Sequence, residues 1–416
     1  MEDDVASSVE ALRGVSITRA SVVDDVVHYA FDVRVGAGPN GVLRLHRIVR
    51  ERRPGVPRRT SNAIMLMHGD FASFPSNFAQ VLSDPDTSSP GVALWLAQHG
   101  VDVWGLDRRW TQAEGAEPDL SGFDAMGLEQ ELSDIGKALA VARAVRFVTS
   151  RATGKMILSG FSRGGALAYY YASYEESLPP WRQHLKGLVP IDVYASLPPE
   201  AEDLRQFYCG LAADGYAALD AGVVNVPNDF QIGVGERFFA APDELNPFAP
   251  FDFPFPGATN RDLMLDFVGV TWFYFGASPL YHLNAPVLDD NGEFAIALRS
   301  VSENAIARWL ADAPAHQSTR ESADTDAILC DASSSPIEVP LSRIEVPLFL
   351  LGAAGGYGEL AVFSTTEVSS TDVSSHIVRK LDPNGEAEDY GHADLLFADD
   401  APELAWTPLL EWLQLH

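Results

Sequence analysis

The chain has 416 residues, of which 46% are hydrophobic and 21% are charged, as in ordinary soluble globular proteins with a large apolar core. The 58 acidic residues outnumber the 29 basic ones and give a formal net charge of −29. Such a surface repels phosphate backbones and anionic lipid headgroups, which argues against nucleic acid as a partner. The charge favours solubility, with a saline habitat as the alternative interpretation.

The two cysteines and the N-terminal residues further limit the class of protein that the sequence can represent. Cys209 and Cys330 are too few for a disulfide framework and match no metal-binding spacing, and whether they pair with each other stays open. Met1 to Asp4 carry no apolar targeting segment, and no apolar run approaches the ~20 residues of a membrane span. We therefore expect a soluble protein, cytoplasmic by default and secreted if a signal peptide has been trimmed. The sequence supports no expectation about oligomeric state.

The first predicted elements are two strands. Residues 27–35 and 42–48 alternate apolar and polar side chains with a period of two, and residues 36–41 between them have turn composition. These features predict an antiparallel hairpin. The basic, proline-containing stretch at residues 50–59 predicts a surface loop.

Beyond the hairpin, short apolar runs alternate with helical patterns. Continuous apolar runs are typical of strands that are covered on both faces of a parallel sheet. The runs lie at residues 63–67, 101–106, 156–159, 187–191 and 346–351. Helical patterns lie at residues 90–98, 128–150, 166–174 and 402–415. The alternation predicts an α/β fold with a doubly wound, mostly parallel sheet.

The alternation stops after Leu197 and resumes at Ile344. The residues between are rich in proline and aromatic side chains and show no βα repeat. We therefore predict one α/β domain built from residues 1–197 and 341–416, interrupted by an insertion at residues 198–340. Within the insertion, the Ser- and Asp-rich stretch 318–336 predicts a loop that returns to the core.

A nucleophile motif lies at the end of the third apolar run. Ser162 stands between Gly160 and Gly164, after the predicted strand and before a helix of small residues. Glycines at these positions are needed because a side chain there would collide with a tight strand-to-helix turn. The helix N-terminus adds free amides that favour developing negative charge. Ser162 is therefore the predicted nucleophile.

A serine nucleophile needs a base and an oxyanion hole. His392 follows the last predicted strand, at residues 376–381, and precedes the closing helix, which is where hydrolases with this nucleophile turn carry the base. For the hole, two backbone N–H groups must face the developing oxyanion. We assign one to the amide of Arg163. The other comes from the turn after the first apolar run, with Asp70 favoured over Phe71.

With these residues placed, the chain resembles the α/β-hydrolase superfamily over residues 60–195 and 341–416. The resemblance rests on Met67-His68-Gly69, Gly100 to Asp107, Gly160 to Gly164 and Tyr390-Gly391-His392. Residues 42–48, 392–397 and 400–401 are similar to the acid-lipase branch. The resemblance implies an esterase or lipase that cleaves a carboxylic ester through an acyl-enzyme, with no cofactor and no metal.

The acid partner of His392 departs from the superfamily's usual pattern. It usually follows the strand predicted at 346–351, but this chain has a glycine-rich run there and no carboxylate before Glu359. The resemblance allows a second position, after the preceding strand, where Asp192 stands. We choose Asp192 as the catalytic acid and keep Glu359 as the alternative, since a strand-end Asp can also cap a loop.

The insertion bears on the substrate. In the superfamily, insertions at this place form a cap over the nucleophile, which the resemblance implies for residues 198–340. Its aromatic side chains would line an acyl pocket or form the cap's own core. We expect a small-molecule ester that is bulky or apolar. The alternatives are hydrolysis of an amide, a lactone or a carbon–carbon bond, and a catalytically degenerate binding protein.

Overall fold

The computed structural model describes residues 15–38, 40–85, 87, 89–113, 118–275, 281–331 and 337–416. Met1 to Asp4, on which the expectation about targeting rests, lie outside the described residues, as does residue 39 of the predicted turn. Within the described ranges, no helix is both long enough and apolar enough to cross a membrane.

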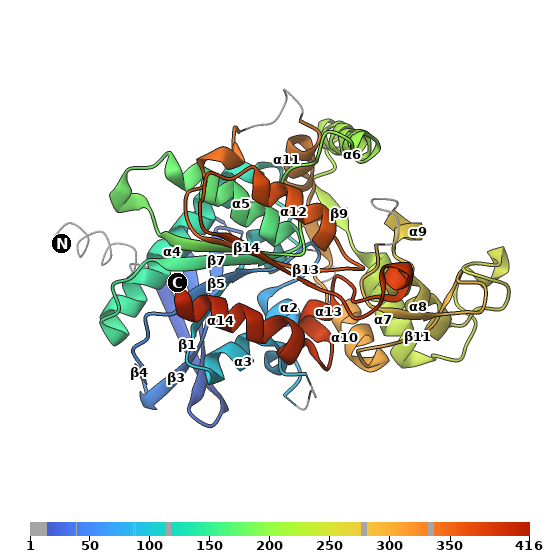
Figure 1. The fold of residues 1–416 in the computed structure, drawn as a ribbon, viewed down its shortest axis with the longest axis horizontal. Helices are drawn as coiled ribbons and strands as arrows, with labels where there is room; N and C mark the ends of the chain where they lie inside the picture. Colours follow the sequence, from blue (N-terminus) through green and yellow to red (C-terminus); the bar gives the residue numbers. More distant parts are fainter. Residues whose placement is uncertain are drawn as a thin grey trace.

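One large sheet forms the centre of the molecule (Figure 1), in the order β1-β2-β3-β6-β5-β7-β8-β13-β14, with β4 paired to β3. The strands are β1 (Val15–Val23), β2 (Val26–Arg34), β3 (Val42–Arg53), β4 (Val56–Pro57), β5 (Ala63–Met67), β6 (Asp102–Asp107), β7 (Met156–Phe161), β8 (Leu185–Ile191), β13 (Leu348–Ala353) and β14 (Val373–Val378). Neighbours from β1 to β6 are antiparallel, and neighbours from β6 to β14 are parallel. The predicted mostly parallel α/β sheet is confirmed.

Helices cover both faces of this sheet (Figure 1). On one face lie α4 (Leu128–Ser150), α5 (Arg163–Glu176) and α12 (Gly358–Thr366), and on the other α3 (Val92–Gln98) and α14 (Thr407–Leu415). In β5, Ala63, Met65 and Met67 pack with α4 and α5, whereas Ile64 and Leu66 pack with α3 and α14. Alternate strand residues point to opposite faces, so a run that is apolar at every position must be covered on both.

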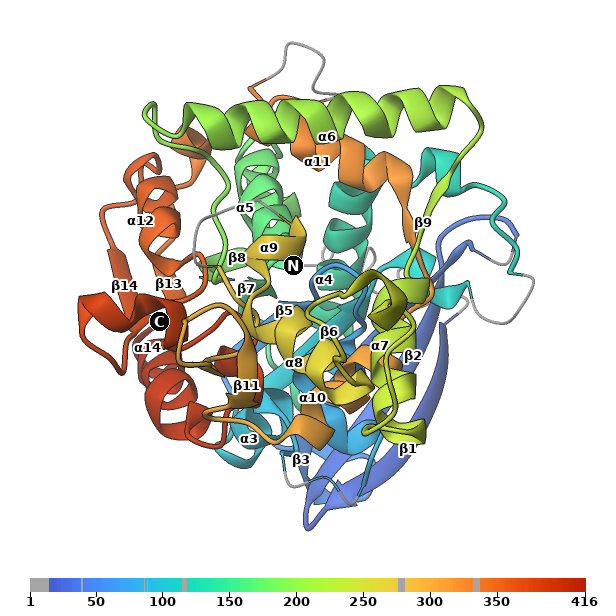
Figure 2. The same cartoon turned by 90° about the vertical axis from the view of Figure 1, so that its right-hand side faces the viewer.

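A long segment connects β8 to its neighbour β13, and after the predicted insertion we call it the inserted segment. Its elements are α6 (Glu202–Asp220), β9 (Asn225–Pro227), α7 (Asp229–Ala240), α8 (Asn260–Gly269), α9 (Trp272–Phe275), β10 (Pro286–Leu288), β11 (Ala295–Leu298), α10 (Glu303–Ala311), β12 (His316–Ser318) and α11 (Thr319–Leu329). Figure 2 shows α6 as a long helix with α11 beside it. A disulfide joins Cys209 of α6 to Cys330 at the end of α11, so the two cysteines do pair.

Two loop predictions were wrong. In the stretch 50–59, β3 continues to Arg53 and β4 pairs back onto it through a turn at Gly55, whose φ is +76°. In the stretch 318–336, the described part is mostly α11, and residues 332–336 lie outside the description. Ser318 caps α11 by accepting the amide of Glu321. Ser and Asp favour loops and helix N-termini alike, so composition did not separate the two.

Candidate active site

Ser162 occupies a strained turn between β7 and α5. Its φ of 53° and ψ of −130° are unfavourable for a residue other than glycine, and such strain is common at functional sites. Two glycines permit the turn. A Cβ on Gly160 would lie 2.1 Å from the carbonyl oxygen of Gly164, and a Cβ on Gly164 would lie 2.3 Å from that of Met67. The Ser162 amide donates to the carbonyl of Ile191 at 3.0 Å, which fixes the turn at the carboxyl end of β8.

Asp192 and His392 are in direct contact. His392 Nδ1 lies 2.6 Å from Asp192 Oδ2, and both side chains are buried. The carboxylate also accepts the amides of Ala353 at 2.8 Å and Tyr357 at 3.0 Å. Asp192 directly follows β8, with a φ of 48°. These contacts fix the carboxylate, so it can hold the imidazole in one orientation and one tautomer.

The alternative acid, Glu359, lies elsewhere. Its side chain is 60% exposed on α12 and pairs with Arg379 at 2.7 Å. The glycine-rich run before Glu359 has a different role, because a Cβ on Gly356 would lie 2.1 Å from Asp192 Oδ2. The run therefore lets the backbone approach Asp192 closely enough to donate its amides. The structure brings Asp192, and not Glu359, to His392.

The inserted segment holds the loop that carries His392. The amides of His392 and Ala393 donate to the carbonyls of His282 and Leu283, at 3.0 and 2.6 Å. In turn, Nε2 of His282 lies 2.7 Å from the carbonyl oxygen of Asp389, in the same loop as His392. Residues more than 100 positions away along the chain therefore determine where the His392 loop lies.

Aromatic rings surround the imidazole of His392. Phe161 stacks on it with a centroid distance of 4.3 Å, and Tyr281 and Tyr357 each lie 5.5 Å from it. The two tyrosine rings stack on each other at 4.2 Å. Burial, and then the nearby carboxylate of Asp192, raise the pKa of the Tyr281 phenol well above its ordinary value, so this phenol is neutral at physiological pH. No motif in the sequence indicated these rings.

The turn after β5 lies against the candidate nucleophile. A Cβ on Gly69 would lie 3.2 Å from the Cβ of the serine. The amide of Phe71 is occupied, because it donates to Gln317 Oε1 at 3.0 Å. The amide of Asp70 has no partner among the described residues, and that of Arg163, the first residue of α5, has no acceptor within its helix. Of the predicted donors, the amides of Asp70 and Arg163 have no acceptor in the described part of the chain, whereas that of Phe71 is occupied.

An ion-pair network that no motif suggested lies beside this turn. The guanidinium of Arg163 contacts Asp70 at 3.0 Å and Asp326 at 2.9 Å. Burial by itself would raise the pKa of Asp70, but the charges of Arg163 and Arg108 outweigh burial and hold that pKa below its ordinary value. Arg108 also pairs with Glu321 of α11. The carboxylate of Asp70 is therefore charged and held in place by the guanidinium of Arg163.

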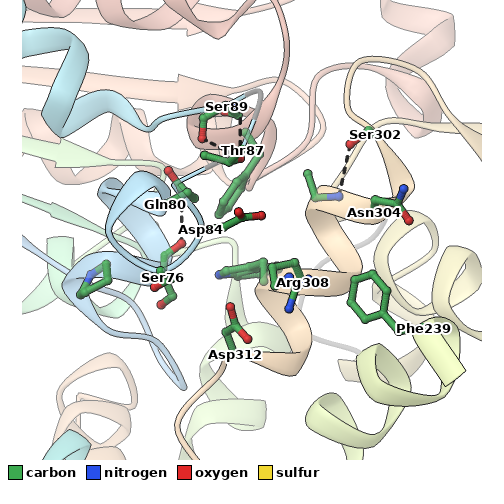
Figure 3. A pocket seen from close by; sticks show the side chains of 15 residues that line it. Ser76, Gln80, Asp84, Thr87, Ser89, Phe239, Ser302, Asn304, Arg308 and Asp312 are labelled. Carbon is green, nitrogen blue, oxygen red and sulfur yellow. Dashed lines mark hydrogen bonds between the residues drawn. The ribbon is translucent and has the colours of Figure 1, made fainter. Parts of the chain in front are cut away.

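A separate cavity of about 480 Å³ opens between α10 and the segment around α2 (Phe74–Phe78). Figure 3 shows Arg308 of α10 between Asp84 and Asp312, with Phe239 at one side. The residues that line this cavity do not include Ser162, Asp192 or His392. In the described part of the chain, no group of three or more His, Cys, Asp or Glu side chains is arranged to hold a metal ion.

Comparison with proteins of known structure shows which fold this chain shares. No family model matches the chain, and no curated protein matches it. A crystal structure of a predicted lipase from Sulfolobus solfataricus matches with a TM-score of 0.64 at 16% identity, over 97% of this chain and 99% of that one. A soluble variant of monoglyceride lipase from Saccharomyces cerevisiae gives a TM-score of 0.48 at 10% identity, over 96% and 95% of the two chains. Proline iminopeptidase from Mycobacterium smegmatis gives 0.43 at 12% identity, over 96% and 98%.

The chain has the α/β-hydrolase fold. The mostly parallel sheet, the helices on both of its faces and the likeness to the Sulfolobus solfataricus structure all support this assignment. The fold implied by the sequence motifs is thereby confirmed.

Proposed function

We propose that this protein is a serine hydrolase that cleaves a carboxylic ester through an acyl-enzyme. The observation that carries the proposal is the 2.6 Å contact between His392 Nδ1 and Asp192 Oδ2, at the same end of the sheet as Ser162 on its strained turn. A serine on a strand-to-helix turn, together with a histidine that is oriented by an acid, is the arrangement that serine hydrolases use on several unrelated folds.

In the first half-reaction, His392 Nε2 accepts the proton of the Ser162 hydroxyl as the serine oxygen attacks the ester carbonyl. The carbonyl oxygen becomes an oxyanion, and the amides of Asp70 and Arg163 stabilise it by hydrogen bonds. Asp192 holds the proton on Nδ1 and stabilises the imidazolium. Collapse of the tetrahedral intermediate breaks the ester C–O bond, and His392 donates its proton to the leaving alkoxide.

In the second half-reaction, water attacks the acyl-enzyme and His392 accepts a proton from it. The same two amides stabilise the second oxyanion. Collapse releases the carboxylic acid and returns the proton to the Ser162 oxygen. The cycle restores every group of the enzyme, so it uses no cofactor.

We assign residues 198–340 to a cap over this site. Two contacts support the assignment, because Tyr281 lies 5.5 Å from the His392 ring and Gln317 bonds the turn that carries Asp70. Ligand sites are mostly apolar and concave, so the aromatic side chains of the cap fit a bulky or apolar ester.

Turnover of p-nitrophenyl esters tests the proposal. Ser162→Ala should lower kcat by about 10³-fold or more, because the remaining amides cannot replace a nucleophile. Ser177→Ala is the matched control, since it removes a hydroxyl just beyond the other end of α5, where the side chain donates to the carbonyl of Tyr174. The control should retain full turnover, and equal turnover by Ser162→Ala and wild type would contradict the proposal.

Labelling with a fluorophosphonate probe distinguishes a serine hydrolase from a binding protein that has lost its activity. The probe should label Ser162 in the wild type and leave Ser162→Ala unlabelled. Labelling with negligible ester turnover would indicate a hydrolase that cleaves an amide, a lactone or a carbon–carbon bond. Absence of both labelling and turnover would indicate a binding protein.

A further inference from the structure

We propose that Gln317, in the inserted segment, is a positioning residue that holds the oxyanion turn of the α/β domain in its working geometry. The inference rests on the proposed function, because it concerns the same hole. It assigns a part of the catalytic geometry to a residue that lies 247 positions from the turn in sequence.

The amide side chain of Gln317 uses both of its ends on the turn. Its Nε2 donates to Asp70 Oδ1 at 2.6 Å, and its Oε1 accepts the amide of Phe71 at 3.0 Å. The remaining hydrogen on Nε2 is directed to Ser322 Oγ at 3.2 Å. Gln317 is 1% exposed, so water does not compete for these bonds.

These two bonds fix the residue that supplies the first oxyanion donor. Phe71 has a φ of 47°, a conformation that is unfavourable for an aromatic residue and persists only where its surroundings hold it. The bond to Gln317 holds the Phe71 amide, and Gln317 and Arg163 together hold the Asp70 carboxylate. With its side chain and the next amide both held, the Asp70 backbone keeps its own amide free for the substrate.

Gln317 is itself held in a rigid frame. It is the central residue of β12, which pairs with β9, and the next residue, Ser318, caps α11. The Ser318 hydroxyl also bonds the carbonyl of Met126 at 2.8 Å. A donor held only through flexible contacts would not fix the turn, whereas a residue on a strand that is paired with β9 and followed directly by a capped helix does.

The same segment holds the turn at a second place. Glu321 of α11 pairs with Arg108, whose guanidinium donates to the carbonyl oxygens of Gly69 and His68, the latter at 3.2 Å. Arg108 therefore contacts residues 68 and 69 of the turn, and Gln317 contacts residues 70 and 71. The carbonyl side of the turn depends on Glu321 through Arg108, and the amide side depends on Gln317 directly.

Gln317→Met tests the inference, because methionine has nearly the same length and forms neither bond. Loss of one oxyanion donor costs about 10²–10³-fold in kcat, so a misplaced donor should cost about 10–100-fold. KM should change by less than about 3-fold, since the ground-state carbonyl depends little on the hole. The inhibition constant of an alkylboronic acid, whose tetrahedral adduct on Ser162 occupies the hole, should rise by the same factor as kcat falls.

The control variant is Asn225→Ala. Asn225 lies on β9 in the same two-stranded ribbon, and its side chain contacts the ring of His316 instead of the turn. It should match the wild type within about 3-fold in kcat and in boronate inhibition. Active-site titration with the fluorophosphonate counts intact sites, so kcat is expressed per labelled serine and a partly unfolded sample is not mistaken for a slow one.

An unchanged kcat per labelled site, or an unchanged boronate inhibition constant, in Gln317→Met would overturn the inference. If that variant does not fold, Gln317→Glu replaces it, since the carboxylate keeps the acceptor for Phe71 and loses the donor to Asp70. The same losses are expected and the same results would overturn the inference. If the wild type is active and the variant has the same kcat and inhibition constant, only the role of Gln317 is rejected. If the wild type neither hydrolyses esters nor is labelled, the proposed function is rejected as well.

Discussion

At the scale of single residues, the candidate site concentrates unfavourable backbone conformations. Ser162, Asp192 and Phe71 have φ values of 53°, 48° and 47°. Each such residue costs about 1–3 kcal/mol and persists only where neighbouring contacts hold it. Here those contacts are the carbonyl of Ile191, the backbone of β13 and the side chain of Gln317. These conformations place the Ser162 hydroxyl, the Asp192 carboxylate and the oxyanion turn at the same end of the parallel strands.

The proposed acid gives a prediction at this scale. Asp192→Asn should lower kcat on p-nitrophenyl esters by about 10³–10⁴-fold, because an amide in contact with Nδ1 favours the wrong imidazole tautomer and cannot stabilise the imidazolium. Glu359→Gln is the matched control and should stay within about 2-fold of the wild type, because Glu359 contacts Arg379 on the surface. A large loss in Glu359→Gln with normal turnover in Asp192→Asn would reverse the assignment.

At the scale of elements, the disulfide joins two helices of the inserted segment. Cys209 in α6 and Cys330 after α11 are separated by 121 residues, and Figure 2 shows the two helices side by side. α11 also carries Glu321, which holds Arg108 beside the oxyanion turn. The covalent link therefore reinforces the element from which the segment contacts the site.

Loss of this link should destabilise the protein. A bridge that closes a loop of this length stabilises the folded state by about 4–5 kcal/mol in the chain-entropy account. Urea unfolding followed by tryptophan fluorescence should therefore shift to lower denaturant when dithiothreitol is added. The double variant Cys209→Ser, Cys330→Ser should unfold at that lower midpoint with or without reductant. Equal midpoints for oxidised and reduced wild type would show that the bridge adds nothing.

At the scale of the whole molecule, the charge is the dominant feature. The 29 basic residues balance the charge of only half of the 58 acidic ones, so an excess of 29 negative charges remains. Their mutual repulsion weakens the compact state, and dissolved salt screens it over a distance of about 10 Å at 0.1 M.

The melting temperature should therefore rise with ionic strength. Between about 20 and 200 mM NaCl, screening worth about 1 kcal/mol would raise it by about 1 °C, because the unfolding entropy of a 416-residue chain is about 0.9 kcal/mol/K. Differential scanning calorimetry measures the shift. KCl at equal ionic strength should give the same increase, because screening does not depend on the identity of a monovalent ion. A flat or falling melting temperature would mean that the ion pairs lost to screening outweigh the repulsion.

The sequence by itself determined the features that depend on neighbouring residues. β5 and α4 have the bounds that their patterns predicted, at 63–67 and 128–150, because apolar periodicity reports how each segment is buried. The strained turn at Ser162 was predictable because the close approaches at Gly160 and Gly164 are local to the turn and its neighbouring strand.

Only the tertiary structure decided which distant groups meet. Asp192 and Glu359 were both plausible partners of His392, and 200 residues separate Asp192 from the histidine that it contacts. The sequence left open the pairing of Cys209 with Cys330 and the role of the glycine-rich run that places Gly356 beside Asp192. The bonds of Gln317 to the oxyanion turn carried no signal in the sequence. The physical reason is that local residues determine backbone conformation and burial, whereas contacts between side chains depend on where the ends of separate strands and helices come together in space.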